Sequence, residues 1–231
     1  MKPVGAPTGE PLGGFPGESA GPRIGRVGLL GGTFDPIHLG HLRLARLSIT
    51  ERRLDRLYFL PAFAPPHKTE REISDFQARA EMLKLALADE DKMDICLVEK
   101  ELPLPSYTIT TLRHLTVGYL SGCQVFFVIG SDSLFDLPTW RGYEDILATV
   151  HLLVARRPGC GDLTAMVQRL GYHIDGDRCW RSGKKDIFFL SGEVPAVSSS
   201  ALRAALRRGE ECSLLPPTVA AWLQRRRLYE K

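Results

Sequence analysis

The sequence of 231 residues lacks the features that mark secreted, membrane-spanning and nucleic-acid-coating proteins. Its five cysteines are an odd number and none stands in a C-x-x-C pair, which favours reduced thiols over a disulfide framework. No apolar run approaches the roughly 18 residues that a membrane-spanning helix needs. The net charge of +3 is too small to indicate nonspecific nucleic-acid binding. We therefore expect a cytoplasmic protein whose partners include neither a membrane nor a nucleic acid.

Two widespread phosphate-binding motifs are also missing. The segment Gly28-Leu29-Leu30-Gly31-Gly32 does not match G-x-G-x-x-G, the fingerprint of dinucleotide-binding dehydrogenases. A Walker A loop, G-x-x-x-x-G-K-[ST], is absent as well. These absences argue against hydride transfer and against a P-loop kinase.

The first 22 residues are rich in glycine and proline and contain no apolar core. We expect residues 1–22 to form a disordered extension, neither a secretory signal nor a folded element. Residues 23–231 show no internal repeat and no clear linker. We expect one domain there, with a small helical C-terminal portion.

Apolar segments of strand character alternate with helical patterns along that domain. Because strands that alternate with helices form βαβ units with right-handed crossovers, the pattern predicts an α/β fold with a doubly wound parallel sheet. The expected strands are Val27–Leu30, Leu57–Leu60, Met93–Val98, Gln124–Ile129, His151–Ala155 and Ile187–Leu190. The expected helices are Leu42–Arg53, Phe76–Ala88, Tyr107–Leu120, Glu144–Ala148, Leu163–Leu170, Ser198–Arg208 and Pro217–Arg227.

The segment 31–41 carries the most concentrated signal. It joins an expected strand to an expected helix through two glycines, Asp35-Pro36 and two histidines. Backbone N–H groups at a helix start favour anions, and His38 and His41 share one face of a helical turn. We interpret the segment as a nucleotide phosphate site. A simple tight connection and a zinc site of Asp35, His38 and His41 are the alternatives, the latter weakened because no cysteine is near.

Further polar residues follow the ends of other expected strands. Ligands of open parallel sheets bind at the carboxyl ends of the strands, so these residues should gather near the histidines. Three serines offer a helix N-cap and free N–H groups, which make a second anion site. The residues are Lys68 after the second strand, Gly130 and Asp132 after the fourth, Arg157 after the fifth, and Ser198, Ser199, Ser200 and Arg203 after the sixth.

At this point the motifs resemble those of the nucleotidyltransferase superfamily. Gly31-Gly32-Thr33-Phe34-Asp35-Pro36 with His38-Leu39-Gly40-His41 resembles its first motif. Val197-Ser198-Ser199-Ser200-Ala201-Leu202-Arg203 is similar to its second, I-S-S-T-x-I-R, with Ser200 in place of the usual Thr. Within the superfamily, the order and spacing of four further segments resemble the bacterial nicotinate-nucleotide adenylyltransferase family. These are Pro65-Pro66-His67-Lys68, Tyr107–Leu112, Gly130–Leu134 and Trp140.

The resemblance implies a Rossmann-like fold and adenylyl transfer from ATP to nicotinate mononucleotide, which gives nicotinate adenine dinucleotide and pyrophosphate in NAD biosynthesis. It implies Mg²⁺ as a bridge on the triphosphate, with no metal ligated by a dedicated protein site. The attacking phosphate is already anionic near neutral pH, so no general base is required. The enzyme has to supply in-line positioning and neutralisation of charge.

The resemblance also implies three groups of site residues. The catalytic group is His38, His41, Lys68 and Arg203. The ATP-binding group is Gly31, Gly32, Thr33, Phe34, His41, Gly130, Asp132, Ser199, Ser200 and Arg203. The mononucleotide-binding group is Lys68, Tyr107, Thr108, Trp140 and Arg157, with Trp140 stacked on the nicotinate ring.

Other functions remain open from the sequence. An adenylyltransferase of the same superfamily could use nicotinamide mononucleotide or phosphopantetheine as the acceptor. A class I aminoacyl-tRNA synthetase fragment would need a K-M-S-K-S loop, which is absent. A nonenzymatic nucleotide-binding module would be expected to have lost part of the set His38, His41, Lys68 and Arg203, and all four are present. The sequence indicates no particular oligomeric state.

Overall fold

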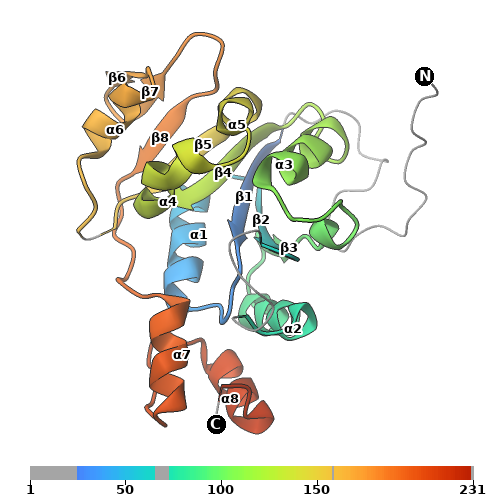
Figure 1. Ribbon diagram of the computed structural model, residues 1–231. Coiled ribbons are helices and arrows are strands. Elements are labelled where there is room, and N and C mark those ends of the chain that lie inside the picture. The colour runs from blue at the N-terminus through green and yellow to red at the C-terminus, as the bar shows by residue number, and fades with distance from the viewer. Residues whose placement is uncertain (1–24, 66–72, 158, 230–231) are drawn as a thin grey trace, which may run out of the picture.

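A computed structural model describes residues 25–65, 73–157 and 159–229 (Figure 1). The expected N-terminal extension, residues 1–22, and Lys68 lie outside the described residues. The strands are β1 Arg26–Gly32, β2 Arg56–Pro61, β3 Met93–Ile95, β4 Gln124–Gly130, β5 His151–Ala155, β6 His173–Asp175, β7 Arg178–Trp180 and β8 Ile187–Leu190. The α-helices are α1 Leu39–Arg52, α2 Phe76–Leu87, α3 Thr108–Val117, α4 Ser131–Asp136, α5 Tyr143–Thr149, α6 Leu163–Arg169, α7 Ser199–Arg207 and α8 Pro217–Arg226. Short 3₁₀ turns cover Val98–Lys100 and Leu137–Thr139.

The strands form one eight-stranded sheet in the order β3-β2-β1-β4-β5-β8-β7-β6. Neighbours from β3 to β8 pair in parallel, whereas the β6–β7 hairpin adds to the edge in antiparallel fashion. The predicted doubly wound parallel sheet is therefore confirmed. After β1 the chain builds outward through β2 and β3, then returns to place β4 on the other side of β1. This reversal of strand order opens a crevice at the carboxyl ends of β1 and β4.

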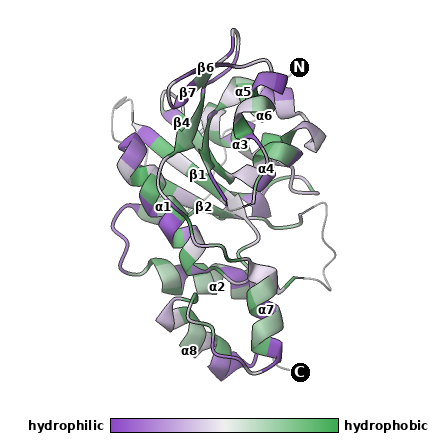
Figure 2. Cartoon of the chain, turned by 90° about the vertical axis from the view of Figure 1, so that its left-hand side faces the viewer, coloured by the Kyte–Doolittle hydropathy of each residue, from purple (hydrophilic) through white to green (hydrophobic). Residues whose placement is uncertain are grey.

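Both faces of the sheet are buried, which explains why its strands read as nearly continuous apolar runs. Along β4, Phe127 and Ile129 face a core cluster that includes residues of α3 and α5. Phe126 and Val128 face a second cluster that includes residues of α1 and α2. The central strands are largely green in Figure 2, while the helices alternate between green and purple, as expected for helices with one buried face.

The predicted helical C-terminal portion is present as α7 and α8, and both helices contribute residues to the second core cluster. Leu202 of α7 and Val219 of α8 are buried in it. Helix α8 lies beside α2, and the Thr218 hydroxyl donates to the Leu85 carbonyl at 2.9 Å (Figure 1). This packing brings the last described residues close to the loop that follows β1.

Three parts of the fold differ from the expected elements. Helix α4, Ser131–Asp136, was not among the expected helices, because six residues are too few to show a helical period. The expected strand Met93–Val98 ends at Ile95, and a 3₁₀ turn begins at Val98. The β6–β7 hairpin was not predicted, because its strands have three residues each and are almost wholly exposed. A strand that short and exposed carries no apolar alternation to detect.

Candidate active site

The loop of residues 31–41, here called the first-motif loop, leads from β1 into α1 and ends in a reciprocal cap of two histidines. His38 is the N-cap, and its Nδ1 accepts a hydrogen bond from the His41 backbone N–H at 3.3 Å. The Nδ1 of His41 accepts in return from the His38 backbone N–H at 3.3 Å. The two rings stack with centroids 3.6 Å apart. Since each Nδ1 accepts, the neutral form of each ring carries its proton on Nε2.

Burial keeps both rings neutral. Burial, with the charge of Arg157 acting in the same direction, lowers the pKa of His38 to about 4. Burial also holds the pKa of His41 well below its ordinary value, and the charges of His38 and Arg157 act in the same direction. Two neutral imidazoles can stack without charge repulsion. Each then has one Nε2–H donor that the cap does not use.

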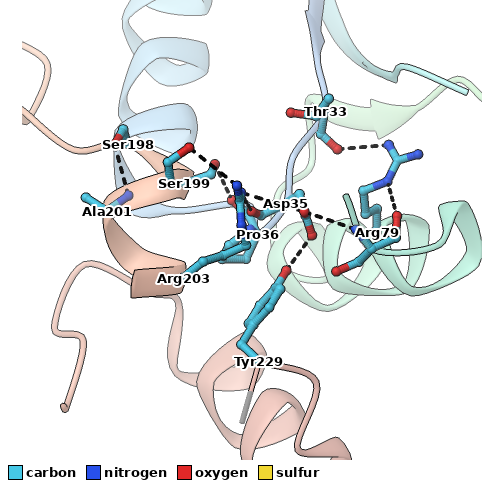
Figure 3. A network of polar contacts seen from close by, with 11 residues as sticks. Thr33, Asp35, Pro36, Arg79, Ser198, Ser199, Ala201, Arg203 and Tyr229 are labelled. Atoms are coloured by element: carbon cyan, nitrogen blue, oxygen red, sulfur yellow. Dashed lines mark hydrogen bonds and ion pairs between the residues drawn. The ribbon is translucent and has the colours of Figure 1, made fainter. Parts of the chain in front are cut away.

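The first-motif loop is in close contact with the second motif. A Cβ added to Gly40 would lie 2.7 Å from Val197 Cγ1, so only glycine lets the two segments approach this closely. The Ser199 hydroxyl donates to the Pro36 carbonyl at 2.9 Å. Ser198 caps α7 by accepting from the Ala201 N–H at 3.2 Å (Figure 3). The two predicted anion sites are therefore neighbours.

Arg203 spans the gap between these two segments. Its Nη1 donates to the Asp35 carbonyl at 2.6 Å, and its Nη2 donates to the Ser200 hydroxyl at 3.4 Å (Figure 3). Within the described part of the chain, the buried Nε of Arg203 has no hydrogen-bond partner. The guanidinium is thus anchored on one side and keeps unused donors for a ligand.

The end of β4 adds a third side to the site. A Cβ added to Gly130 would lie 2.3 Å from Asp132 Oδ1 and 2.9 Å from Arg157 Nε, so both side chains fold over a bare backbone. Arg157 Nη1 pairs with Asp132 Oδ2 at 3.3 Å, and the Arg157 backbone N–H donates to the Ser131 hydroxyl at 3.1 Å. Arg157 was expected with the mononucleotide-binding group. In the structure it lies beside two members of the ATP-binding group, and its charge acts on both histidines.

The other mononucleotide-binding residues lie around the start of α3. Tyr107 is the N-cap of α3, and Thr108 is its first residue. Trp140 is half-buried and packs edge-on against Phe127 with ring centroids 6.4 Å apart. The guanidinium of Arg141, next to Trp140, lies 4.6 Å from the centre of the Tyr107 ring. The structure therefore brings together the two segments that sequence reasoning assigned to one pocket.

Phe34 and Thr33 of the ATP-binding group both make contacts within the protein that their residue types did not indicate. The Phe34 side chain is buried and packs edge-on against the His41 ring at 5.0 Å, so its backbone alone can meet a ligand. The Thr33 carbonyl accepts a hydrogen bond from Arg79 at 2.9 Å. Gly31 is exposed, and Gly32 is partly exposed, as an approach by ligand requires.

Sequence reasoning missed two buried charged residues that support the site. Arg79 of α2 is 1% exposed and donates to the carbonyls of Thr33, Ala62 and Ser74 at 2.9, 2.8 and 3.0 Å. Glu99 accepts from the Phe63 N–H at 3.0 Å and from a hydroxyl of α3 at 2.9 Å. In the sequence Arg79 stands between two alanines and Glu99 between Val98 and Lys100, and a charged residue in such a helical or loop context is usually exposed. No sequence signal would have identified either.

The zinc alternative finds no support. Asp35 is fully buried and both its carboxylate oxygens already accept hydrogen bonds, from Tyr229 and from Ser74. No group of three or more His, Cys, Asp and Glu side chains in the described ranges is arranged to hold a metal ion. Among the described residues, no helix is both long and apolar enough to cross a membrane.

Comparisons with known proteins agree with this geometry. A family model described as cytidylyltransferase-like matches residues 29–205. A probable nicotinate-nucleotide adenylyltransferase of Desulfotalea psychrophila is 36% identical and covers 88% of this chain and 99% of its own. A protein of the same description from Cronobacter sakazakii is 37% identical and covers 86% of this chain and 93% of its own. The solved nicotinic acid mononucleotide adenylyltransferase of Plasmodium falciparum, complexed with NaAD, shares the fold with a TM-score of 0.69 at 17% identity, covering 89% of this chain and 97% of that one. The chain belongs to the nicotinate-nucleotide adenylyltransferase family of nucleotidyltransferases.

Proposed function

We propose that this nucleotidyltransferase moves the adenylyl group of ATP to nicotinate mononucleotide between two facing sets of donors. One set is the histidine cap of α1, His38 with His41. The other is the start of α7 with Ser199, Ser200 and Arg203. The observation that carries this proposal is the direct contact of the two motifs, where Arg203 donates to the Asp35 carbonyl at 2.6 Å.

The transfer forms one bond and breaks one. A phosphate oxygen of the mononucleotide attacks the α-phosphorus of ATP, and the bond from that phosphorus to the oxygen of the β-phosphate breaks. Nicotinate adenine dinucleotide and pyrophosphate result. The attacking oxygen carries no proton, so the protein has to align the two phosphates and stabilise charge on the leaving group.

The neutral histidines suit this task. Their low pKa values leave the Nε2–H donors uncharged until the triphosphate binds. The nearby anion then raises the affinity of each ring for a proton, because an opposite charge favours the charged form. The permanent charge comes from Arg203, and we place Lys68, which lies outside the described residues, at the phosphates as well.

Nucleotidyltransferases of this kind generally use a divalent metal, and we propose that it is Mg²⁺ and enters bound to ATP. The charge of Arg157 acts on both histidines, and Arg203 binds the first-motif loop; both cations repel a free metal ion and attract phosphate oxygens. Asp132 is a nearby carboxylate, but it is paired with Arg157 at 3.3 Å. This donor set fits a metal that arrives on the triphosphate, where it neutralises charge on the phosphate oxygens.

The acceptor pocket favours an acid over an amide. The first N–H groups of α3, at Thr108, have no intrahelical partner and carry positive partial charge. The carboxylate of nicotinate gains more from them than the neutral amide of nicotinamide does. We propose that Trp140 stacks on the pyridine ring and that Tyr107 forms the adjoining wall.

Pyrophosphate release with alternative acceptors tests the function. The protein is incubated with ATP and Mg²⁺ plus nicotinate mononucleotide, nicotinamide mononucleotide or phosphopantetheine. We expect the highest kcat/KM with nicotinate mononucleotide. Release with none of the three would contradict an enzymatic role, and preference for phosphopantetheine would contradict the choice of acceptor.

We also infer a cytosolic location for this activity. All five cysteines are free thiols, and Cys96 and Cys179 are buried without a disulfide partner. Buried free thiols are typical of proteins in reducing compartments.

We treat residues 23–231 as one domain, because residues from β1 to Tyr229 share the two core clusters.

A further inference from the structure

A buried polar cluster lies directly beneath Arg203. At its centre is Asp35, with 0% of its surface exposed. The Tyr229 hydroxyl donates to Asp35 Oδ1 at 2.5 Å, and the Ser74 N–H donates to Oδ2 at 3.1 Å. Arg203 Nη1 lies 3.6 Å from Oδ2, farther than its 2.6 Å contact with the Asp35 carbonyl. Figure 3 shows Arg203 reaching Asp35 from α7 and Tyr229 reaching it from the segment that follows α8.

We propose that Tyr229 is a positioning residue for the adenylyl transfer, because its hydroxyl keeps the Asp35 carboxylate from capturing the Arg203 guanidinium. This inference rests on the proposed role of Arg203 at the phosphates. Tyr229 itself touches no reacting atom in it. Its effect passes through Asp35.

The physical reason is competition for the carboxylate. A carboxylate and a guanidinium prefer two parallel hydrogen bonds. Asp35 and Arg203 do not adopt that arrangement: Arg203 Nη1 lies 3.6 Å from Oδ2, while the Tyr229 hydroxyl and the Ser74 N–H donate to the two oxygens and hold the carboxylate in place. Without the hydroxyl, a buried oxygen would be left without a donor, which is costly. The nearest mobile donor is Arg203, and a turn toward the carboxylate would remove it from the phosphates.

Tyr229 is suited to this task at any physiological pH. Burial, and the charge of Asp35 next to it, raise the pKa of the Tyr229 hydroxyl. The hydroxyl therefore stays protonated and always donates. Its place is set by α8, which ends at Arg226 and is fixed on α2 through the Thr218 hydroxyl. The C-terminal segment in this way completes a cluster whose other residues are Asp35 of the first-motif loop, Arg203 of α7 and Ser74, which precedes α2.

The test is Tyr229→Phe, which removes only the hydroxyl. We expect kcat to fall roughly tenfold while KM for nicotinate mononucleotide stays within about twofold, as for loss of an interaction made in the transition state. The matched control is Tyr172→Phe. Tyr172 is also buried, and its hydroxyl donates to the Lys185 carbonyl at 2.9 Å. Tyr172→Phe should lower the melting temperature by about as much as Tyr229→Phe does and leave kcat unchanged. Equal kcat losses in both variants would overturn the inference.

Two further variants separate this inference from the proposed function. If Arg203→Ala leaves kcat intact, the proposed role of Arg203 fails, and the inference fails with it. If Arg203→Ala lowers kcat and Tyr229→Phe does not, only the inference fails. In the Arg203→Ala background, Tyr229→Phe should cause no further loss of kcat, and a full tenfold loss there would contradict action through Arg203.

A rescue variant tests the capture itself. Asp35→Asn in the Tyr229→Phe background removes the charge that attracts Arg203 but keeps a side chain of the same size. We expect kcat to recover at least partly. A further decrease in kcat would refute capture by the carboxylate.

Discussion

The two ring nitrogens of His41 perform different tasks, so substitutions that keep one or the other separate folding from catalysis. The Nδ1 accepts from the His38 N–H at 3.3 Å and completes the cap of α1. We propose that the Nε2–H binds a phosphate oxygen. Asparagine places an acceptor near the position of Nδ1 and has nothing at Nε2. Glutamine reaches the position of Nε2 with a donor but supports the cap poorly. Alanine lacks both groups.

The sizes of the two effects follow from these contacts. Loss of a donor aimed at developing charge costs about 10²–10³ in kcat, or about 2.7–4 kcal/mol. Loss of an N-cap interaction costs about 0.5–2 kcal/mol of stability. The edge-on contact of the ring with Phe34 at 5.0 Å adds about 0.5–1.5 kcal/mol. At about 2–4 °C per kcal/mol for a chain of this size, His41→Ala should melt roughly 2–14 °C lower.

The assay pairs steady-state formation of the dinucleotide with thermal unfolding. His41→Asn should melt above His41→Ala but share its low kcat. His41→Gln should retain more kcat than His41→Asn and melt below it. If His41→Asn had the kcat of the unaltered protein, Nε2 would have no part in the reaction. A raised KM with unchanged kcat in all three variants would mean that His41 binds ground state and transition state equally.

Three other predictions concern single residues. The pKa of His38 is 6.5 in the unfolded chain and about 4 in the fold, so unfolding takes up a proton between these pH values. The contribution of His38 to the free energy of unfolding should therefore drop by about 3 kcal/mol as pH falls from 6.5 to 4. Urea unfolding at several pH values should show a shallower dependence for His38→Asn. Trp140→Ala should raise KM for nicotinate mononucleotide at least tenfold and leave KM for ATP unchanged, and Trp140→Phe should have a milder effect. An equal rise in KM for both substrates would contradict ring stacking. Arg157→Ala should raise KM for ATP more than KM for the mononucleotide, and the reverse ratio would return Arg157 to the acceptor pocket.

The position of the site could be predicted from the sequence because it depends on local order along the chain. Alternating strands and helices predict a parallel sheet, and a parallel sheet places the residues after each strand on one edge. Gly130 is the last residue of β4, Asp132 lies two residues beyond it, and Arg157 lies two residues beyond the end of β5. That Arg157 lies near enough to act on His38 and His41 therefore follows from the order of the elements along the chain.

The supporting contacts could not be predicted in this way, because they join residues that are distant in sequence. Tyr229 and Asp35 are 194 positions apart, and their hydrogen bond depends on how α8 packs against α2. Arg79 reaches the carbonyls of Thr33 and Ala62 from the first turn of α2. A buried polar side chain is recognised by its partners, and a single sequence does not state which carbonyl or carboxylate will be near.

The donors that we place at the phosphates are also structural groups, and this dual use pre-organises the site. His38 and His41 hold the start of α1 through Nδ1, and Arg203 holds the first-motif loop through Nη1. Their remaining donors are therefore fixed in direction before ATP arrives, so little reorganisation is needed in the transition state. The same arrangement is the reason why we assign a positioning role to the hydroxyl of Tyr229, which is distant in sequence. The Arg203 guanidinium binds the Asp35 carbonyl and lies 3.6 Å from the Asp35 carboxylate. The Tyr229 hydroxyl, which donates to that carboxylate, therefore also determines where the free donors of Arg203 point.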